Sequence, residues 1–198
     1  MKKYFIALVS LVFVVNIQAQ KIKLVDGDLN FLKGQDKIGV KFTYDENLKV
    51  GPGTEAQYIN KKMAAAEEGE AGSGEKWKEA WYSDRTIHYQ PKFMELFEKV
   101  LEKKDVLLLD NGEPSTYTMI VNTTFIEPGF NIGISSKRAS VDMTVTFVET
   151  ANPDKEMAKF LIKRSPGTAT YDAGSRVGES YAKAAKYFAK YLLKEKAF

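Results

Sequence analysis

The residues best suited to acid–base chemistry lie around His88, the only histidine of the chain. Asp84 precedes it by one helical turn, so a helix would place the carboxylate where it could orient the imidazole. Such a pair could act as the general base of a hydrolase. However, no nucleophile-elbow motif accompanies it, and a histidine on a helix surface is the simpler interpretation. We expect no catalytic residues, and a hydrolase using His88 is kept as an alternative.

Carboxylates in two short runs could bind a cation: Asp26 and Asp28, then Asp45 and Glu46. Neither run continues into the spaced oxygen ligands of a calcium loop, and Asp, Asn and Gly are common turn formers. The chain has no cysteine and a single histidine, which leaves too few ligands for a typical zinc site. We expect no metal and no cofactor, and leave open whether these four carboxylates bind a cation.

Aromatic side chains form the best candidate for a binding surface: Trp77, Trp81, Tyr82 and Tyr89. Aromatic residues are enriched at protein interfaces. At helical spacing they also commonly pack in a core. We expect Trp81 to be the more buried of the four and Tyr82 and Tyr89 to be more accessible.

The first 19 residues have the pattern of a secretory signal peptide. Lys2 and Lys3 precede an apolar run from Tyr4 to Val15, and Ala19 offers a cleavage site. About 12 apolar residues are too few to cross a bilayer core, which needs ~20. The sequence therefore predicts an exported protein, periplasmic or secreted, that is cleaved after Ala19 and has no stable membrane insertion afterwards.

The net charge of the chain is +3, and loss of the two leader lysines lowers it to +1. Proteins that bind nucleic acids usually carry a marked basic excess. We therefore expect no nucleic-acid partner.

Strands are predicted from alternating apolar residues. The clearest run is Arg138 to Val148, in which Ala139, Val141, Met143, Val145 and Phe147 share one side. Short links join it to predicted strands at 116–126 and 156–164, so it should be the inner strand of an antiparallel meander. Residues 38–44 predict another strand, and 106–109 a short buried one.

Helices are predicted in two regions. Thr54 and Gln57 form a capping box for a helix that is followed by a mobile, glycine-rich connection at 67–75. A strong amphipathic pattern follows Pro91, and the bias of Gln90 away from helical angles favours a break there. The last helix should start at Asp172 or Ser175 and bury the stripe Val177, Tyr181, Ala184, Ala185, Phe188 and Leu192.

These elements predict an α+β fold: a mostly antiparallel sheet of about five or six strands, with helices packed on one face, including a C-terminal helix. Residues 20–198 should form a single domain with a helical insertion at about 54–104. The strand Val141–Val148, a hairpin, a Gly/Ser lead-in and the closing helix with Arg176–Lys186 resemble, in layout, the small bacterial envelope domains of the TolB amino-terminal and curli-secretion-lipoprotein type. That resemblance implies a non-catalytic part of an envelope or transport assembly.

The leading hypothesis is thus a non-enzymatic exported binding or assembly domain of the bacterial cell envelope, whose partner is an envelope protein. The alternative from a different class is a carrier of a small apolar ligand or sugar, with a pocket between helices and sheet.

Overall fold

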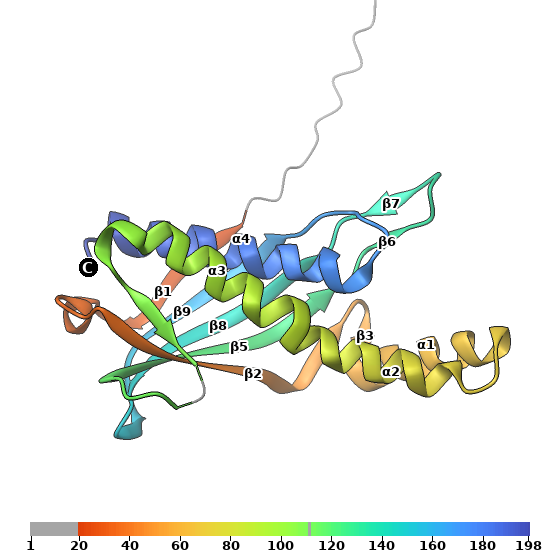
Figure 1. Cartoon of the computed structure of the whole chain (residues 1–198), viewed down its shortest axis with the longest axis horizontal. Coiled ribbons are helices and arrows are strands. Elements are labelled where there is room, and N and C mark those ends of the chain that lie inside the picture. Colours follow the sequence, from red (N-terminus) through yellow and green to blue (C-terminus); the bar gives the residue numbers. More distant parts are fainter. Residues whose placement is uncertain (1–19, 111) are drawn as a thin grey trace, which may run out of the picture.

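A computed structural model describes residues 20–110 and 112–198; the predicted leader, residues 1–19 with its cleavage site at Ala19, lies outside the described residues. The element order is strand, crossover helices, strands and closing helix (Figure 1). The elements are β1 (Lys21–Gly27), η1 (Asn30–Leu32), β2 (Lys37–Val50), β3 (Gly53–Thr54), α1 (Glu55–Gly69), α2 (Ser73–Asp84), η2 (Arg85–Tyr89), α3 (Gln90–Leu101), η3 (Glu102–Lys104), β4 (Leu107–Leu109), β5 (Tyr117–Glu127), β6 (Phe130–Asn131), β7 (Ser136–Lys137), β8 (Ser140–Glu149), β9 (Asn152–Pro166) and α4 (Ala173–Lys194).

The main sheet of the described residues has seven strands in the order β1-β9-β8-β5-β2-β3, with β4 pairing with β2. It is a mixed sheet, so the prediction of a mostly antiparallel one was wrong: β2 pairs in parallel with both β5 and β4. The cause is the helical segment between β2 and β4. It carries the chain back over the sheet to the end where β2 began, and a crossover of this kind joins parallel strands.

Strand β8 lies between β5 and β9, antiparallel to both, as predicted from the short links to its neighbours. Its predicted apolar row, Ala139 to Phe147, is buried. The closing helix α4 is also confirmed. All six residues of its predicted stripe are inaccessible to solvent, and Asp172 caps the helix by accepting a hydrogen bond from the Ser175 amide at 2.6 Å.

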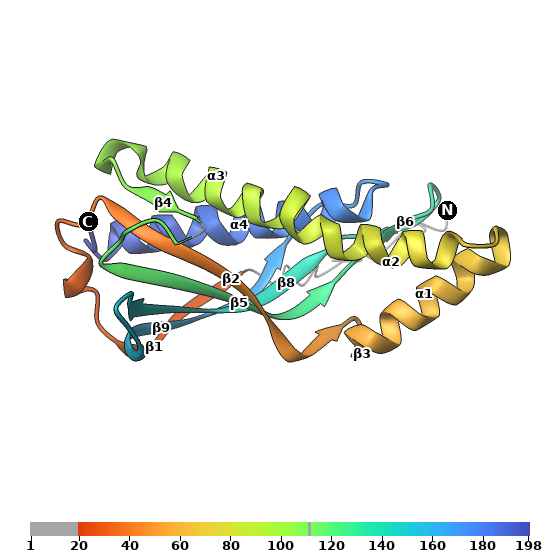
Figure 2. The same cartoon turned by 60° about the horizontal axis from the view of Figure 1, so that its bottom comes forward.

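Helices α3 and α4 cover the same face of the sheet (Figure 2). Ring contacts join the layers: Phe93 of α3 lies 5.6 Å from Phe42 of β2, and Phe188 of α4 lies 4.9 Å from Phe160 of β9. One face of the sheet thus contributes to a continuous apolar core, while its other face presents polar side chains such as Lys41 and Thr144. None of the helices in the described ranges combines the length and the apolar character needed to cross a membrane.

The helical path from α2 to α3 is continuous, so the break predicted before Pro91 does not occur. Gln90 keeps helical angles (φ −62°, ψ −48°). Instead, Arg85–Tyr89 forms a wider π turn. Proline lacks an amide hydrogen and its ring clashes with the carbonyl four residues earlier in a regular helix. A π turn just before Pro91 relieves both problems, because it changes the hydrogen-bond spacing at this position.

Helices α1 and α2 form a hairpin that projects beyond the sheet (Figures 1 and 2). The predicted capping box of Thr54 and Gln57 is present at the start of α1. Residues 67–75 are more ordered than predicted: α1 continues to Gly69, and the Glu67 carboxylate accepts hydrogen bonds from the amides of Gly72 and Gly74, at 2.7 and 3.0 Å. These two bonds stabilise the ionised carboxylate and lower the pKa of Glu67. The carboxylate therefore holds the turn between α1 and α2 in place.

Candidate functional site

His88 and Asp84 lie where η2 packs against the start of α4. His88 Nε2 is 3.7 Å from Asp84 Oδ1, which is too long for a hydrogen bond. A Cβ added at Gly174 would lie 2.4 Å from Asp84 Oδ1, so only glycine permits this close helix contact. Burial raises the pKa of Asp84, although the nearby His88 lowers it. Within the described ranges, His88 makes no hydrogen bond to a hydroxyl that could serve as a nucleophile, and the pair fits helix packing better than hydrolysis.

Two of the four candidate cation ligands bond to nearby backbone: Asp28 just after β1, and Asp45 in β2 where its pairing with β5 is irregular. Asp26 and Glu46 lie in β1 and β2. Asp28 Oδ1 accepts a hydrogen bond from the Asn30 amide at 2.7 Å, and Asp45 Oδ1 accepts one from the Asn47 amide at 2.8 Å. These are the local bonds by which aspartate stabilises a turn. Over residues 20–110 and 112–198, no group of three or more acidic or histidine side chains is placed to hold a metal ion.

The four predicted surface aromatics separate into two groups. Trp81 is buried, as expected, and Trp77 stacks on it with 5.8 Å between ring centroids. Tyr89 is also buried and stacks on Tyr181 at 5.0 Å, so the expectation that it is accessible was wrong. Its ring packs against helix α4 instead of facing solvent. Of the four, Tyr82 remains well exposed, and the cluster is mainly a packing element.

A polar network fixes α1 to the π turn. Arg85 donates two hydrogen bonds to the Glu55 carboxylate, at 2.7 and 2.8 Å, and Trp81 Nε1 donates a third at 2.7 Å. The Arg85 guanidinium also lies 3.7 Å from the ring centre of Tyr44, in cation–π geometry. Because Arg85 bonds to both oxygens of the Glu55 carboxylate, the pairing orients both groups. The α1–α2 hairpin is therefore held in a defined position relative to β2.

The Tyr89 hydroxyl is buried without a hydrogen-bond partner. Removing an unpaired buried polar group is favourable. Tyr89→Phe should therefore raise the free energy of unfolding by about 1 kcal/mol, as measured by urea denaturation. Tyr181→Phe is the matched control, because its hydroxyl pairs with Thr123 Oγ1; that variant should be destabilised. Equal loss of stability in both variants would show that the Tyr89 hydroxyl has a partner.

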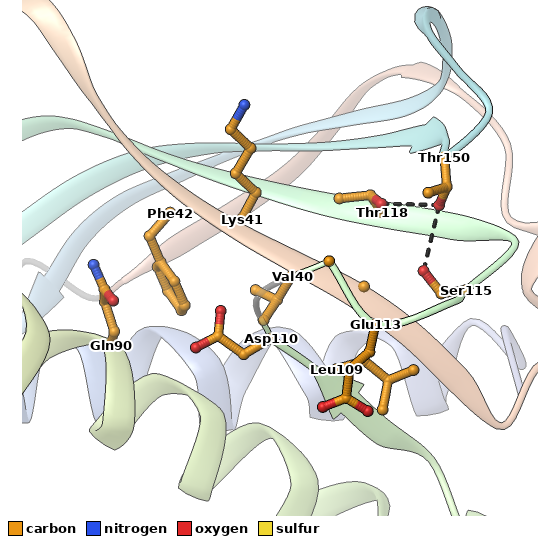
Figure 3. A pocket seen from close by; sticks show the side chains of 12 residues that line it. Val40, Lys41, Phe42, Gln90, Leu109, Asp110, Glu113, Ser115, Thr118 and Thr150 are labelled. Carbon is orange, nitrogen blue, oxygen red and sulfur yellow. Dashed lines mark hydrogen bonds between the residues drawn. The ribbon is translucent and has the colours of Figure 1, made fainter.

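Two of the cavities in the described residues are considered as candidate sites. The first, which we call the edge cleft, opens at the edge of β2 beside the β4–β5 loop and has a volume of about 400 Å³. Figure 3 shows Phe42, Gln90 and Asp110 on the helix side of β2 and Thr118, Thr150 and Ser115 beyond it. Thr118 and Ser115 bond to Thr150 at 2.9 and 3.3 Å. Its lining is mixed, with charged side chains beside Val40, Phe42 and Leu109, and so differs from the apolar carrier pocket expected between helices and sheet.

The second cavity, which we call the end groove, is larger, at about 520 Å³, and lies between α1 and the ends of β2 and β5. Apolar side chains dominate its walls, three glycines leave it open, and two lysines of α1 line it. The lining residues are Val50, Gly51, Pro52, Gly53, Gln57, Tyr58, Lys61, Lys62, Ala65, Glu127, Pro128, Gly129 and Phe130. Tyr58 also contacts Trp77 and Trp81, at 5.8 and 5.0 Å between ring centroids. The predicted aromatic cluster thus supports the wall of a groove that sequence analysis missed.

The sequence carries a signal for the end groove in the two turns Gly51-Pro52-Gly53 and Glu127-Pro128-Gly129, each of which by itself predicts only a connection between elements. Because β2 and β5 are parallel, both turns lie at the same end of the sheet, and Val50 pairs with Ile126. Binding sites in sheets with parallel strands commonly form outside the carboxyl ends of those strands. Recognising the parallel pair would have placed the two turns together.

Comparison with known proteins gives little guidance on function. No family model matches the chain, and no curated protein matches it. Among solved structures, the PelC dodecamer from Paraburkholderia phytofirmans is similar with 11% identity and a TM-score of 0.40, over 85% of this chain and 96% of that one. Protein XCC0632 from Xanthomonas campestris, described as DUF330, has 9% identity and a TM-score of 0.36, over 81% and 85%. At these values the function has to be argued from the geometry.

Proposed function

We propose that this chain is a non-enzymatic, exported binding domain of the cell envelope that holds an apolar segment of a partner protein in the end groove. The observation that carries the proposal is the groove itself, about 520 Å³ of mainly apolar lining at the projecting end of the molecule. Its walls are preformed, because Tyr58 packs on the stacked tryptophans and the Glu55–Arg85 pair fixes α1. Preformed walls reduce the entropy cost of binding.

The charges around the groove indicate the chemistry of the partner. Lys61 and Lys62 line it, while its carboxylate Glu127 already forms an ion pair with Lys137 at 2.5 Å. The charge of the groove lining that has no ion pair is therefore positive. An apolar segment flanked by acidic side chains would be complementary to it, and such complementarity favours both encounter and specificity.

A random-peptide display library selected on the purified chain tests this proposal. We expect the selected peptides to combine apolar residues with Asp or Glu. Lys61→Glu/Lys62→Glu should weaken their binding by about tenfold or more, because two attractive contacts become repulsive. Lys186→Glu/Lys190→Glu on α4 is the matched control, with the same change of charge at exposed positions. The proposal fails if both double variants behave alike, or if Ala65→Trp, which fills the groove, leaves binding unchanged.

A small-ligand carrier is the second candidate, because ligand pockets commonly have volumes of about 300–1,000 Å³ and the end groove falls within this range. Native mass spectrometry of the exported protein distinguishes the two functions: a co-purified small molecule that Ala65→Trp displaces would favour the carrier. The resemblance in layout to the TolB amino-terminal and curli-secretion-lipoprotein domains remains a prediction under either of these two functions.

A further inference from the structure

The β6–β7 hairpin carries a group of exposed apolar side chains, of which only Phe130 also lines the end groove. Ile134 is 97% exposed and Ile132 66%, while Phe130 in the same hairpin is 41% exposed. Tyr171, 75% exposed, lies beside them: a Cβ at Gly133 would be 3.7 Å from its hydroxyl. We call these four residues the hairpin tip. Figure 1 shows β6 and β7 projecting from the body of the molecule, away from the sheet.

The hairpin tip is held in a defined shape by its own hydrogen bonds. The Ile132 amide donates to the Ser135 carbonyl at 3.0 Å, and the Gly133 amide donates to Asn131 Oδ1 at 2.9 Å. The Ile134 amide donates to the Ile132 carbonyl at 3.1 Å. Asn131 also bonds to the Ala169 carbonyl at 2.6 Å. The amides of Ile132, Gly133 and Ile134 are thus satisfied internally while the apolar side chains are exposed, which suits backbone that enters an apolar phase.

The basic side chains near the hairpin tip are Arg138 and the two lysines of the end groove. Lys137 is ion-paired with Glu127, and Asp172, next to Tyr171, caps α4. Phe130 lines the end groove together with Lys61 and Lys62. Apolar side chains that project ahead of basic residues are complementary to the surface of an anionic bilayer, where the former enter the interface and the latter face the head groups. A second copy of this chain would present the same basic charges and is less complementary.

We propose that the hairpin tip inserts reversibly into the interface of an anionic lipid bilayer. The apolar side chains of Phe130, Ile132, Ile134 and Tyr171 enter the region between head groups and acyl chains, and Arg138 lies at the level of the phosphates. This contact orients the domain on a membrane surface without a spanning segment.

The absence of cysteine from the chain allows a single-site test. Ile134→Cys, labelled with an environment-sensitive NBD dye, is compared with Ile87→Cys, an apolar position on η2 that is 62% exposed. The protein beginning at Gln20 is mixed with vesicles of phosphatidylcholine alone, or of phosphatidylcholine and phosphatidylglycerol in equal parts. We expect the emission at position 134 to rise and shift to the blue on the mixed vesicles only, with no change at position 87.

Ile132→Ser in the Ile134→Cys background should lower the partition coefficient, measured by vesicle titration, by about fivefold or more, because less apolar surface enters the interface. Three results would overturn the proposal. They are no change at position 134 with anionic vesicles at low salt, equal changes at positions 134 and 87, and a change at 134 that depends on protein concentration without lipid. The last would show that a second copy of the chain covers the tip.

Discussion

Arg176→Ala is expected to lower the free energy of unfolding by about 2–4 kcal/mol, because the buried Pro128 carbonyl and two partly buried carbonyls would lose their donor and a cavity would form. Arg176 is only 6% exposed. Its Nε donates to the Pro128 carbonyl at 3.0 Å, and its Nη1 donates to the carbonyls of Thr170 and Tyr171, both at 2.6 Å. One side chain of α4 therefore ties together the two segments that support the hairpin tip. Thermal and urea denaturation measure the effect.

Arg138→Ala is the control for this variant, since Arg138 is exposed and its replacement should change stability by no more than about 0.5 kcal/mol. Hydrogen exchange adds a local measurement: in Arg176→Ala, the amides of residues 129–137 should exchange faster than those of β8. Unchanged stability and unchanged exchange would mean that the three carbonyls find other donors and that Arg176 does not organise this end of the molecule.

Unfolding at alkaline pH is the second large effect we expect. Burial raises the pKa of Tyr44, Tyr89 and Tyr181 above the usual value near 10, and raises that of Tyr58 to about 12. Above about pH 10 the unfolded chain loses these protons while the folded chain keeps them. The unfolded state then binds fewer protons, so stability is complete below the unfolded pKa and is lost as the pH rises towards the folded values.

A tyrosine that is ionised in the unfolded chain and protonated in the folded chain contributes a loss of about 1.4 kcal/mol per pH unit. Tyr89 and Tyr181, whose pKa is raised well above the usual value, would together remove up to about 3 kcal/mol per unit, which is a large part of the stability of a typical domain. We expect cooperative unfolding near pH 11, with circular dichroism and tyrosinate absorbance changing together. Tyr89→Phe should make the dependence on pH less steep, and Tyr171→Phe, at an exposed position, is the matched control. Stability that is constant from about pH 9 to 11.5 would contradict this linkage.

Local sequence patterns correctly predicted elements that depend only on nearby residues. The alternation in β8 and the apolar stripe of α4 each show which side chains face the core. Both predictions were correct because one face of each element packs against the same apolar core. The caps at Thr54 and Asp172 were correct for a similar reason, since a cap depends on residues within one turn.

Features that depend on distant parts of the chain were missed. The parallel pairing of β2 depends on where the crossover helices return to the sheet, which the residues of β2 do not encode. The local bias against a helix at Gln90 was overridden, because Trp81 on one side and Phe93 on the other are both anchored in packing contacts. The end groove needs residues 51–53 and 127–130 to meet, and neither turn carries information about the other.

The π turn at Arg85–Tyr89 has a consequence for how the binding surfaces are directed. It holds about one residue more per turn than an α-helix, which corresponds to roughly 100° of rotation about the helix axis. The rotational phase of α2 relative to α3 is therefore set within five residues. Addition or loss of one residue there would turn α1 and its groove wall around the axis while the core contacts of Phe93 and Phe97 stayed in place. Chains of this fold could thus redirect the projecting hairpin towards a different partner by a change in length at a single point.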